Sequence, residues 1–293
     1  MCEPEGLREL EAAHRGRSGV YVLEGAEEAL SARAWMVANA RRTLDIQAFI
    51  WRLDRAGALL ADALVRAAER GVRVRILLDG FGPKPPVEFL AALSGHPNLE
   101  TRIYYPIGTG QLGCLDFGLE FLFRFSELNH RMHNKSFLMD GLVGIVGGRN
   151  FADEYFNWSL DFNFKDRDAF LVGPVVREME ETFDGYWTSA QATPVWASRP
   201  ASPKPAGVTE EGAEGPAEMS RAGNPARVRG DTLEALQGSF CTALEGLVWT
   251  EVRFVAPAAS RFFSGRSALR TRSVASCSTG RATCGSPWSR CRR

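Results

Sequence analysis

A short segment in the middle of the chain holds residues that could do chemistry on a phosphate ester. His133 and Lys135 are two positions apart, so in an extended strand their side chains point the same way. An imidazole and an ammonium group on one phosphate would supply a nucleophile and a stabilising positive charge. Asn150 could donate an amide hydrogen to another phosphate oxygen, while Gly147 and Gly148 would let the backbone come close to the ligand. These residues indicate phosphoryl transfer without a metal ion.

Asp140 belongs to the same segment but is expected to do something else. It follows His133 by seven positions and Lys135 by five, and both spacings are odd. In a regular strand its side chain would therefore face away from theirs. Asp140-Gly141 is also a hairpin signal. We expect Asp140 to fix a turn rather than to contact substrate.

The whole segment resembles the HxKx4Dx6GG signature of the phospholipase D superfamily, with every spacing kept from His133 to Gly148. The following Phe151-Ala152-Asp153-Glu154-Tyr155-Phe156 and the later Val172-Gly173-Pro174 resemble the bacterial cardiolipin synthase branch. The resemblance covers Gly19 to Val195, and weakly Val248 to Pro257. It implies a phosphatidyltransferase that works through a phosphohistidine intermediate, with no metal and no cofactor.

An attacking histidine usually needs its second ring nitrogen held by a carboxylate. The resemblance places this acid seven residues before Gly173, which is Asp166. Asp168 is the alternative. We therefore take His133, Lys135 and Asp166 as catalytic candidates. We take Asn150 as a further phosphate ligand.

The elements that must position these residues alternate between strand and helix from Gly19 to about Thr193. This pattern predicts an α/β fold, with a sheet covered by helices on both faces. The resemblance makes it a mixed sheet of the phospholipase D type. The expected strands are Val20–Leu23, Leu44–Trp51, Val72–Leu78, Glu100–Tyr105, Ser136–Met139, Leu142–Val146 and Ala169–Val172. The expected helices are Glu27–Arg42, Gly57–Arg70, Pro86–Leu93 and Pro174–Ser189.

Composition divides the chain into five parts. We expect an N-terminal segment at 1–18, one complete phospholipase D-like domain at 19–195, and a linker rich in Pro, Ala and Gly at 196–230. A helix at Thr232–Leu247 and a strand at Val248–Val255 would then begin an incomplete second domain at 231–257.

The last part, 258–293, is an Arg/Ser/Cys-rich tail that we expect to be disordered. After Glu251 the sequence contains no acidic residue and no apolar period. One interpretation is a basic tail that binds an acidic partner. The interpretation that we prefer is a shift of reading frame near Ala258.

The proposed chemistry also needs an acid that protonates the leaving oxygen. In the superfamily this is a second histidine from a second copy of the signature. No histidine follows His133; the others are His14, His96 and His130. Either two copies of the chain pair across a twofold axis, or the chain is the front half of a two-motif enzyme. The resemblance at Val248–Pro257 favours the second interpretation.

Bulk properties restrict the partners. The formal net charge is +0, and the absence of a basic stripe argues against nucleic acid. The start is not typical of a signal peptide, no apolar run is long enough to span a membrane, and the six cysteines fit no zinc pattern. We expect a cytoplasmic enzyme, peripheral to the inner membrane face, that moves a phosphatidyl group to an alcohol such as phosphatidylglycerol. The alternatives are a homodimeric single-motif nuclease and a catalytically inactive fragment.

Overall fold

The computed structural model describes residues 4–106, 131–195 and 240–256, and its core is a nine-stranded sheet with the order β8-β4-β3-β2-β5-β6-β7-β1-β9. The strands are β1 (Ser18–Leu23), β2 (Thr43–Ala48), β3 (Arg73–Asp79), β4 (Leu99–Tyr104), β5 (Ser136–Met139), β6 (Val143–Gly147), β7 (Asp168–Val172), β8 (Ala192–Pro194) and β9 (Val248–Thr250).

The sheet is mixed. Strands β2, β3 and β4 run parallel to one another, and every other neighbouring pair is antiparallel. As a result, the ends of β2, β3 and β6 lie at the same edge of the sheet as the beginnings of β5 and β7. We call this the carboxyl edge, after the parallel strands. Residues far apart in the sequence meet there.

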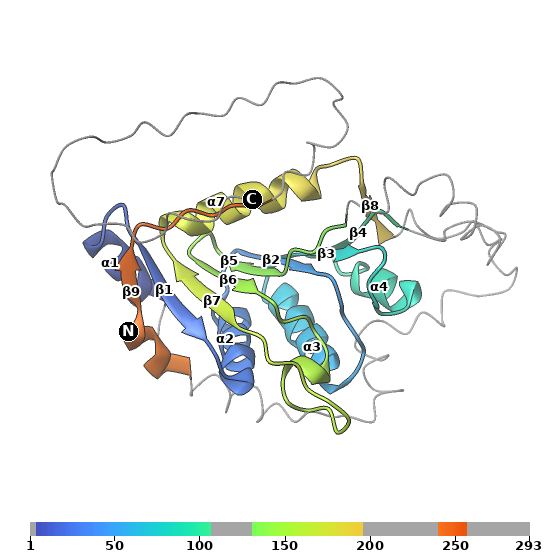
Figure 1. Cartoon of the computed structure of the whole chain (residues 1–293). Coiled ribbons are helices and arrows are strands. Elements are labelled where there is room, and N and C mark those ends of the chain that lie inside the picture. The colour runs from blue at the N-terminus through green and yellow to red at the C-terminus, as the bar shows by residue number, and fades with distance from the viewer. Residues whose placement is uncertain (1–3, 107–130, 196–239, 257–293) are drawn as a thin grey trace, which may run out of the picture.

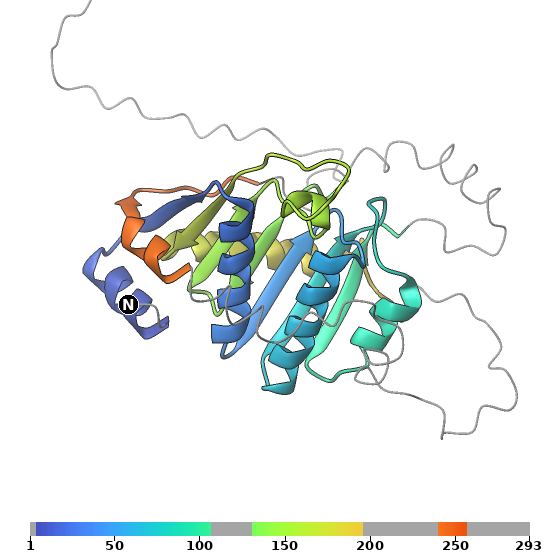
Figure 2. The same cartoon turned by 90° about the horizontal axis from the view of Figure 1, so that it is seen from below.

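Helices cover both faces of the sheet (Figures 1 and 2). Helices α2 (Ala26–Asn39), α3 (Arg55–Glu69) and α4 (Val87–Leu93) lie on one face, and α7 (Pro174–Trp187) lies on the other. A further helix, α1 (Pro4–Ala13), lies beside the β1–β9 end of the sheet. Two 3₁₀ helices, η1 (Asp153–Tyr155) and η4 (Cys241–Gly246), complete the elements.

Local sequence explains where α3 lies. The side chain of Asp54 accepts a hydrogen bond from the Gly57 amide and so caps the first turn. Gly71 follows the last turn with φ of +92°, a conformation that glycine adopts at low cost. Between these two signals, alanines and leucines alternate with charged residues at helical spacing, and the apolar face, which includes Leu60 and Leu64, is buried on the sheet.

The α/β class and the mixed sheet with helices on both faces are confirmed. Each expected strand and helix up to Trp187 is present, with bounds that differ by a few residues. Three elements were not expected: α1, within the N-terminal segment, the 3₁₀ helix η1, and β8, a short edge strand. The end of the expected helix at Thr232–Leu247 is instead the 3₁₀ helix η4, and β9 pairs with β1 in the same sheet.

The predicted linker at 196–230, most of the helix beginning at Thr232, and the tail at 258–293 lie outside the described residues, as does His130. Within the part of the chain that the structure describes, no helix is long and apolar enough to cross a membrane.

Candidate active site

The carboxyl edge brings the predicted site residues together. The start of β5 lies beside the ends of β2 and β6, since Ser136 pairs with both Gln47 and Val146. The end of β6 lies beside the start of β7, where Gly147 pairs with Asp168. Because His133 and Lys135 immediately precede β5, and Asn150 follows β6 closely, all three lie at this edge. The segment of His133 and Lys135 is thus not part of the strand but leads into it.

His133 and Lys135 are in direct contact. The Nζ atom of Lys135 is 3.3 Å from both ring nitrogens of His133 and donates a hydrogen bond of 2.9 Å to the His133 carbonyl oxygen. Phe49, just after β2, lies under both groups: its ring is 4.9 Å from the His133 ring and 5.6 Å from Nζ. The lysine is buried, whereas the histidine is exposed and open to a ligand.

This environment favours a neutral imidazole. Partial burial of the ring, and then the positive charge of Lys135, hold the pKa of His133 below its ordinary value of 6.5. Burial also lowers the pKa of Lys135. At neutral pH the imidazole of His133 therefore has a free lone pair, which a nucleophile requires.

Asp79 was not among the predicted site residues. Asp79 is the last residue of β3 and is fully buried. Its carboxylate accepts hydrogen bonds from the amides of Met132 at 2.9 Å and Phe81 at 2.8 Å. It thereby holds the backbone next to His133, and its negative charge acts to raise the pKa values of His133 and Lys135. The signal in the sequence was an acid at the end of a buried strand, a usual place for cleft residues.

The two candidate orienting acids have different surroundings. Asp168 is buried between two arginines, with its Oδ2 at 2.9 Å from Arg33 and 3.4 Å from Arg149. Burial alone would raise the pKa of Asp168, but the two positive charges hold it below its ordinary value. This carboxylate is therefore committed to ion pairs.

Asp166, the preferred candidate, lies against Gly148, and its negative charge acts to raise the pKa of Lys135. The same charge also acts to raise the pKa of Tyr155, so Asp166 interacts electrostatically with both groups. Its role in orienting the histidine stays a prediction.

The two glycines of the signature have a clear steric reason. A Cβ atom on Gly147 would lie 2.0 Å from Oδ1 of Asp168, and one on Gly148 would lie 2.5 Å from Oδ1 of Asp166. Any larger residue would push the start of β7 away from the end of β6. The glycines let the two carboxylates approach the site.

Asn150 is buried, and its Oδ1 accepts a hydrogen bond of 2.9 Å from the Ile50 amide. With its oxygen held by the backbone, the side-chain NH₂ is the group left to interact elsewhere, and it also lies within hydrogen-bonding reach of the Tyr155 hydroxyl. This orientation suits a donor to a phosphate oxygen.

Asp140 lies at the other end of β5, away from the site. Its backbone is left-handed, with φ of +55°, and its carboxylate accepts hydrogen bonds from the amides of Arg41, Arg42 and Thr43 at 2.7 to 2.9 Å. The side chain thus ties the β5–β6 turn to the beginning of β2.

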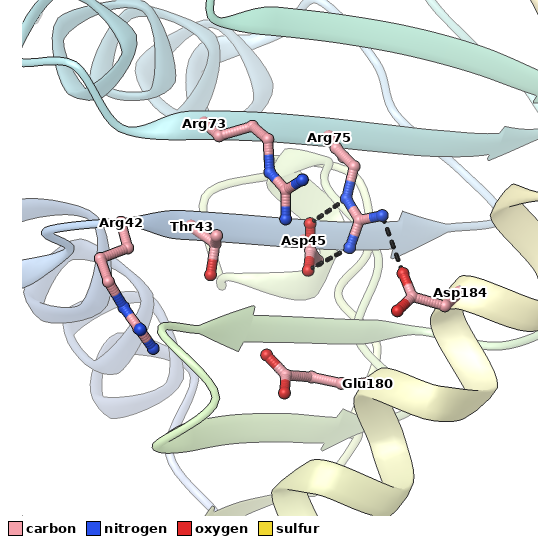
Figure 3. A pocket seen from close by; sticks show the side chains of 7 residues that line it. All are labelled: Arg42, Thr43, Asp45, Arg73, Arg75, Glu180 and Asp184. Carbon is pink, nitrogen blue, oxygen red and sulfur yellow. Dashed lines mark hydrogen bonds and ion pairs between the residues drawn. The ribbon is translucent and has the colours of Figure 1, made fainter.

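A second polar site lies at the opposite, amino edge of the parallel strands (Figure 3). This cavity has a volume of about 320 Å³ and is lined by Arg42, Thr43, Asp45, Arg73, Arg75, Glu180 and Asp184. Arg75 forms two hydrogen bonds with Asp45 and an ion pair with Asp184, which joins the sheet to α7. We call it the amino-edge cavity. None of the predicted site residues lines it.

Comparisons with known proteins agree with the signature. The family described as "Cardiolipin synthase, PLD-like domain" matches residues 35–187. Cardiolipin synthase C of Escherichia coli (strain K12) is 41% identical over 182 residues, which are 62% of this chain and 38% of that protein. The cardiolipin synthase of Oceanobacillus iheyensis is 26% identical over 185 residues, which are 63% of this chain and 36% of that protein. This chain thus spans well under half the length of these relatives.

Among solved structures, that of phosphatidylserine synthase from Haemophilus influenzae aligns with 82% of this chain and 47% of that chain, at 14% sequence identity and a TM-score of 0.47.

Proposed function

Because this chain belongs to the family of cardiolipin synthase, PLD-like domains, we propose that it contributes one half of a phosphatidyltransferase active site and forms a phosphohistidine at His133. The observation that carries the proposal is the contact between Lys135 Nζ and the His133 ring, 3.3 Å apart at the carboxyl edge. A lysine that lowers the pKa of the nucleophile and stabilises phosphoryl charge suits this reaction.

In the first half of the reaction, a ring nitrogen of His133 attacks the phosphorus of a phospholipid. A P–N bond forms and the bond to the leaving alcohol oxygen breaks, while that oxygen takes a proton from a general acid. Lys135 and the amide of Asn150 stabilise the charge on the phosphoryl oxygens. Asp166, through Lys135 or the histidine itself, keeps the positive charges in position.

In the second half, the hydroxyl of an acceptor alcohol attacks phosphorus. Its proton passes to the group that acted as acid, the P–N bond breaks, and His133 is again neutral. We infer that phosphatidylglycerol or a similar alcohol is the acceptor, and that the chain works at the cytoplasmic face of the inner membrane.

The general acid must come from outside the described half-site. Of the other described histidines, His14 stacks on Trp249 at 4.3 Å near β9, and the Nδ1 of His96 accepts a hydrogen bond from the Asn98 amide. Neither lies at the carboxyl edge. We infer that a second copy of the signature, from a second domain or a second chain, supplies this group, and that 19–195 is the domain that carries the first copy.

Trapping the intermediate tests this mechanism. Purified protein mixed with short-chain phosphatidylglycerol and quenched rapidly should gain the mass of one phosphatidyl group, and fragmentation should place it on His133. The variant His133→Ala should gain no mass, whereas His96→Ala, the matched control, should behave like the wild type. An adduct that persists in His133→Ala, or a wild-type protein that forms none, contradicts the proposal.

A further inference from the structure

Exposed apolar side chains of the described residues gather at the carboxyl edge. Large ones stand on the loops that follow β2 and β3 and on the loop that precedes β7: Leu53, Phe81, Leu160, Phe162 and Phe164. The side chain of Leu160 is fully exposed, at 102% of the reference area. Isolated exposed apolar residues are ordinary, but a group beside a candidate active site marks an interaction surface.

Residues 157–167 connect η1 to β7, and we call them the apolar loop. Figure 1 shows this yellow-green segment reaching beyond the end of the sheet. Leu160, Phe162 and Phe164 alternate with polar residues in it.

The apolar loop is held in a defined shape. The side chain of Asn163 bonds to both backbone groups of Ser159, at 3.2 and 2.9 Å, which closes the tip around Leu160. At its base, the Phe164 amide donates to the Glu154 carbonyl oxygen at 2.8 Å, and the Phe164 ring packs 4.9 Å from that of Tyr155. A loop that is already shaped loses little conformational entropy when its tip is buried.

Positive charges flank the apolar loop. The Arg55 guanidinium lies 4.3 Å from the centre of the Trp158 ring, and neither Arg55 nor Lys165 forms an ion pair with a described carboxylate. The other exposed basic groups here, Arg52 and Arg167, are paired with Glu154 and Glu24. The loop carries two acids: Asp161, and Asp166, which lies against Gly148 and whose charge acts on Lys135. Apolar side chains at a tip, with tryptophan and basic residues behind them, match the layers of an anionic bilayer.

We propose that the apolar loop inserts Leu160 and Phe162 into the surface of an anionic phospholipid bilayer, with Arg55 and Lys165 at the level of the phosphates. The inference rests on the proposed function, because it explains how a lipid phosphate reaches His133. The loop contains Asp166 and leads directly into β7, so the bilayer would face the carboxyl edge. A fully projecting leucine suits insertion between lipids better than the flat contact of a second copy of the chain.

Sedimentation with vesicles tests this inference without requiring catalysis. The wild type should bind vesicles of phosphatidylglycerol more strongly than vesicles of phosphatidylcholine. The double variant Leu160→Ser/Phe162→Ser should lose about tenfold in binding to phosphatidylglycerol. Val255→Ser, which changes a side chain 90% exposed outside the apolar loop, is the matched control and should bind like the wild type. His133→Ala should also bind normally, which separates docking from chemistry.

A second variant tests whether weaker vesicle binding by the double variant could result from misfolding. Leu160→Trp should bind at least as strongly as the wild type, and vesicles of brominated phosphatidylglycerol should quench its additional fluorescence. The inference is overturned if the wild type binds neither vesicle, if the double variant binds as well as the wild type, or if bromine leaves the new tryptophan unquenched. It is also overturned if the double variant changes only self-association, because a second copy would then cover the loop.

Discussion

Charged groups lie at both edges of the sheet, but they are partnered differently at the two edges. At the amino edge, the guanidinium of Arg75 is matched by the carboxylates of Asp45 and Asp184. At the carboxyl edge, Lys135 has an imidazole and a carbonyl oxygen as its nearest partners, and no carboxylate of the described residues forms an ion pair with it. At the amino edge, Arg75 is thus paired with carboxylates. At the carboxyl edge, Lys135 has no such partner and can bind an anionic ligand.

The contrast separates a cluster that holds the fold from one that can do chemistry. A paired charge stabilises when its partner stays, and its removal leaves a buried charge uncompensated. An unpaired buried cation costs stability and is useful only when an anion arrives. Four predictions test whether the amino edge serves stability and the carboxyl edge serves chemistry.

The largest effect is expected for Lys135→Met. Formation of the His133 adduct should slow by about 10³-fold, because the phosphoryl charge loses its main stabilising group. The free energy of unfolding in urea should not decrease, since the native lysine is buried without a carboxylate. Lys84→Met, which removes a lysine that donates to the carbonyl oxygens of Gly80 and Gly82, is the control and should keep most of the rate. A Lys135 variant that reacts normally would remove the distinction between the two edges.

Next in size is the effect of Arg75→Met on stability. The free energy of unfolding should fall by about 3 kcal/mol, because the Asp45 side chain, only 3% exposed, loses its partner. The methionine can still pack on Phe183 and Trp187, over which the guanidinium lies. Asp184→Asn changes an acid that is 55% exposed and should cost less than about 1 kcal/mol. Adduct formation should be unaffected in both variants; a large loss of rate would show that the amino edge contributes to chemistry.

A smaller effect is expected on the titration of His133, followed by NMR. Removing the positive charge in Lys135→Met should raise the pKa of His133, because that charge now lowers it. Asp79→Asn should lower the pKa of His133 further, since the Asp79 carboxylate acts in the opposite direction. Shifts in the same direction for both variants would contradict the electrostatic picture of the carboxyl edge.

The smallest effect concerns Glu180 in the amino-edge cavity. Burial, helped by the neighbouring acids Asp45 and Asp184, raises the pKa of Glu180 above its ordinary value of 4.5. The folded chain therefore holds this proton more tightly than the unfolded chain does, and stability falls as pH rises through and above the ordinary carboxyl range. Glu180→Gln should be slightly more stable than the wild type near neutral pH, with the difference disappearing below about pH 4. Equal stability at every pH would mean that the carboxylate finds compensation in the folded chain.

The sequence predicted most of the fold because most helices and strands are determined by nearby residues, through apolar periodicity and capping residues. Strand β3 alternates arginine with buried apolar residues, and α3 has both a capping aspartate and a terminating glycine. The missed elements lack such causes. Strand β8 has three residues and ends on a proline, and it exists only because β4 offers an edge. In α1, the buried residues are only Pro4 and Leu7, so few apolar side chains mark this helix in the sequence.

The site was predictable to the extent that it is contiguous. The spacing of His133 and Lys135 predicted that their side chains lie close together, and the structure shows them in direct contact. Asp79 could not be found in the same way, because it is brought to Met132 by the order of strands in the sheet, across 53 positions of sequence. The different surroundings of Asp166 and Asp168 could not be predicted either. Asp168 forms an ion pair with Arg33, which is remote in sequence and belongs to no recognisable motif.

The place of β5 in the sheet has a consequence for how the chain folds. Strand β2 pairs with β3 on one side and with β5 on the other, and β5 follows it by almost ninety residues. During synthesis the β2–α3–β3 unit can form early, but one side of β2 then presents unpaired amides and carbonyls until residues 136–139 emerge. Closure of the sheet is thus a non-local and slow event, and the Asp140 carboxylate secures it by bonding residues 97 to 99 positions earlier. We expect the nascent chain to be prone to aggregation in that interval.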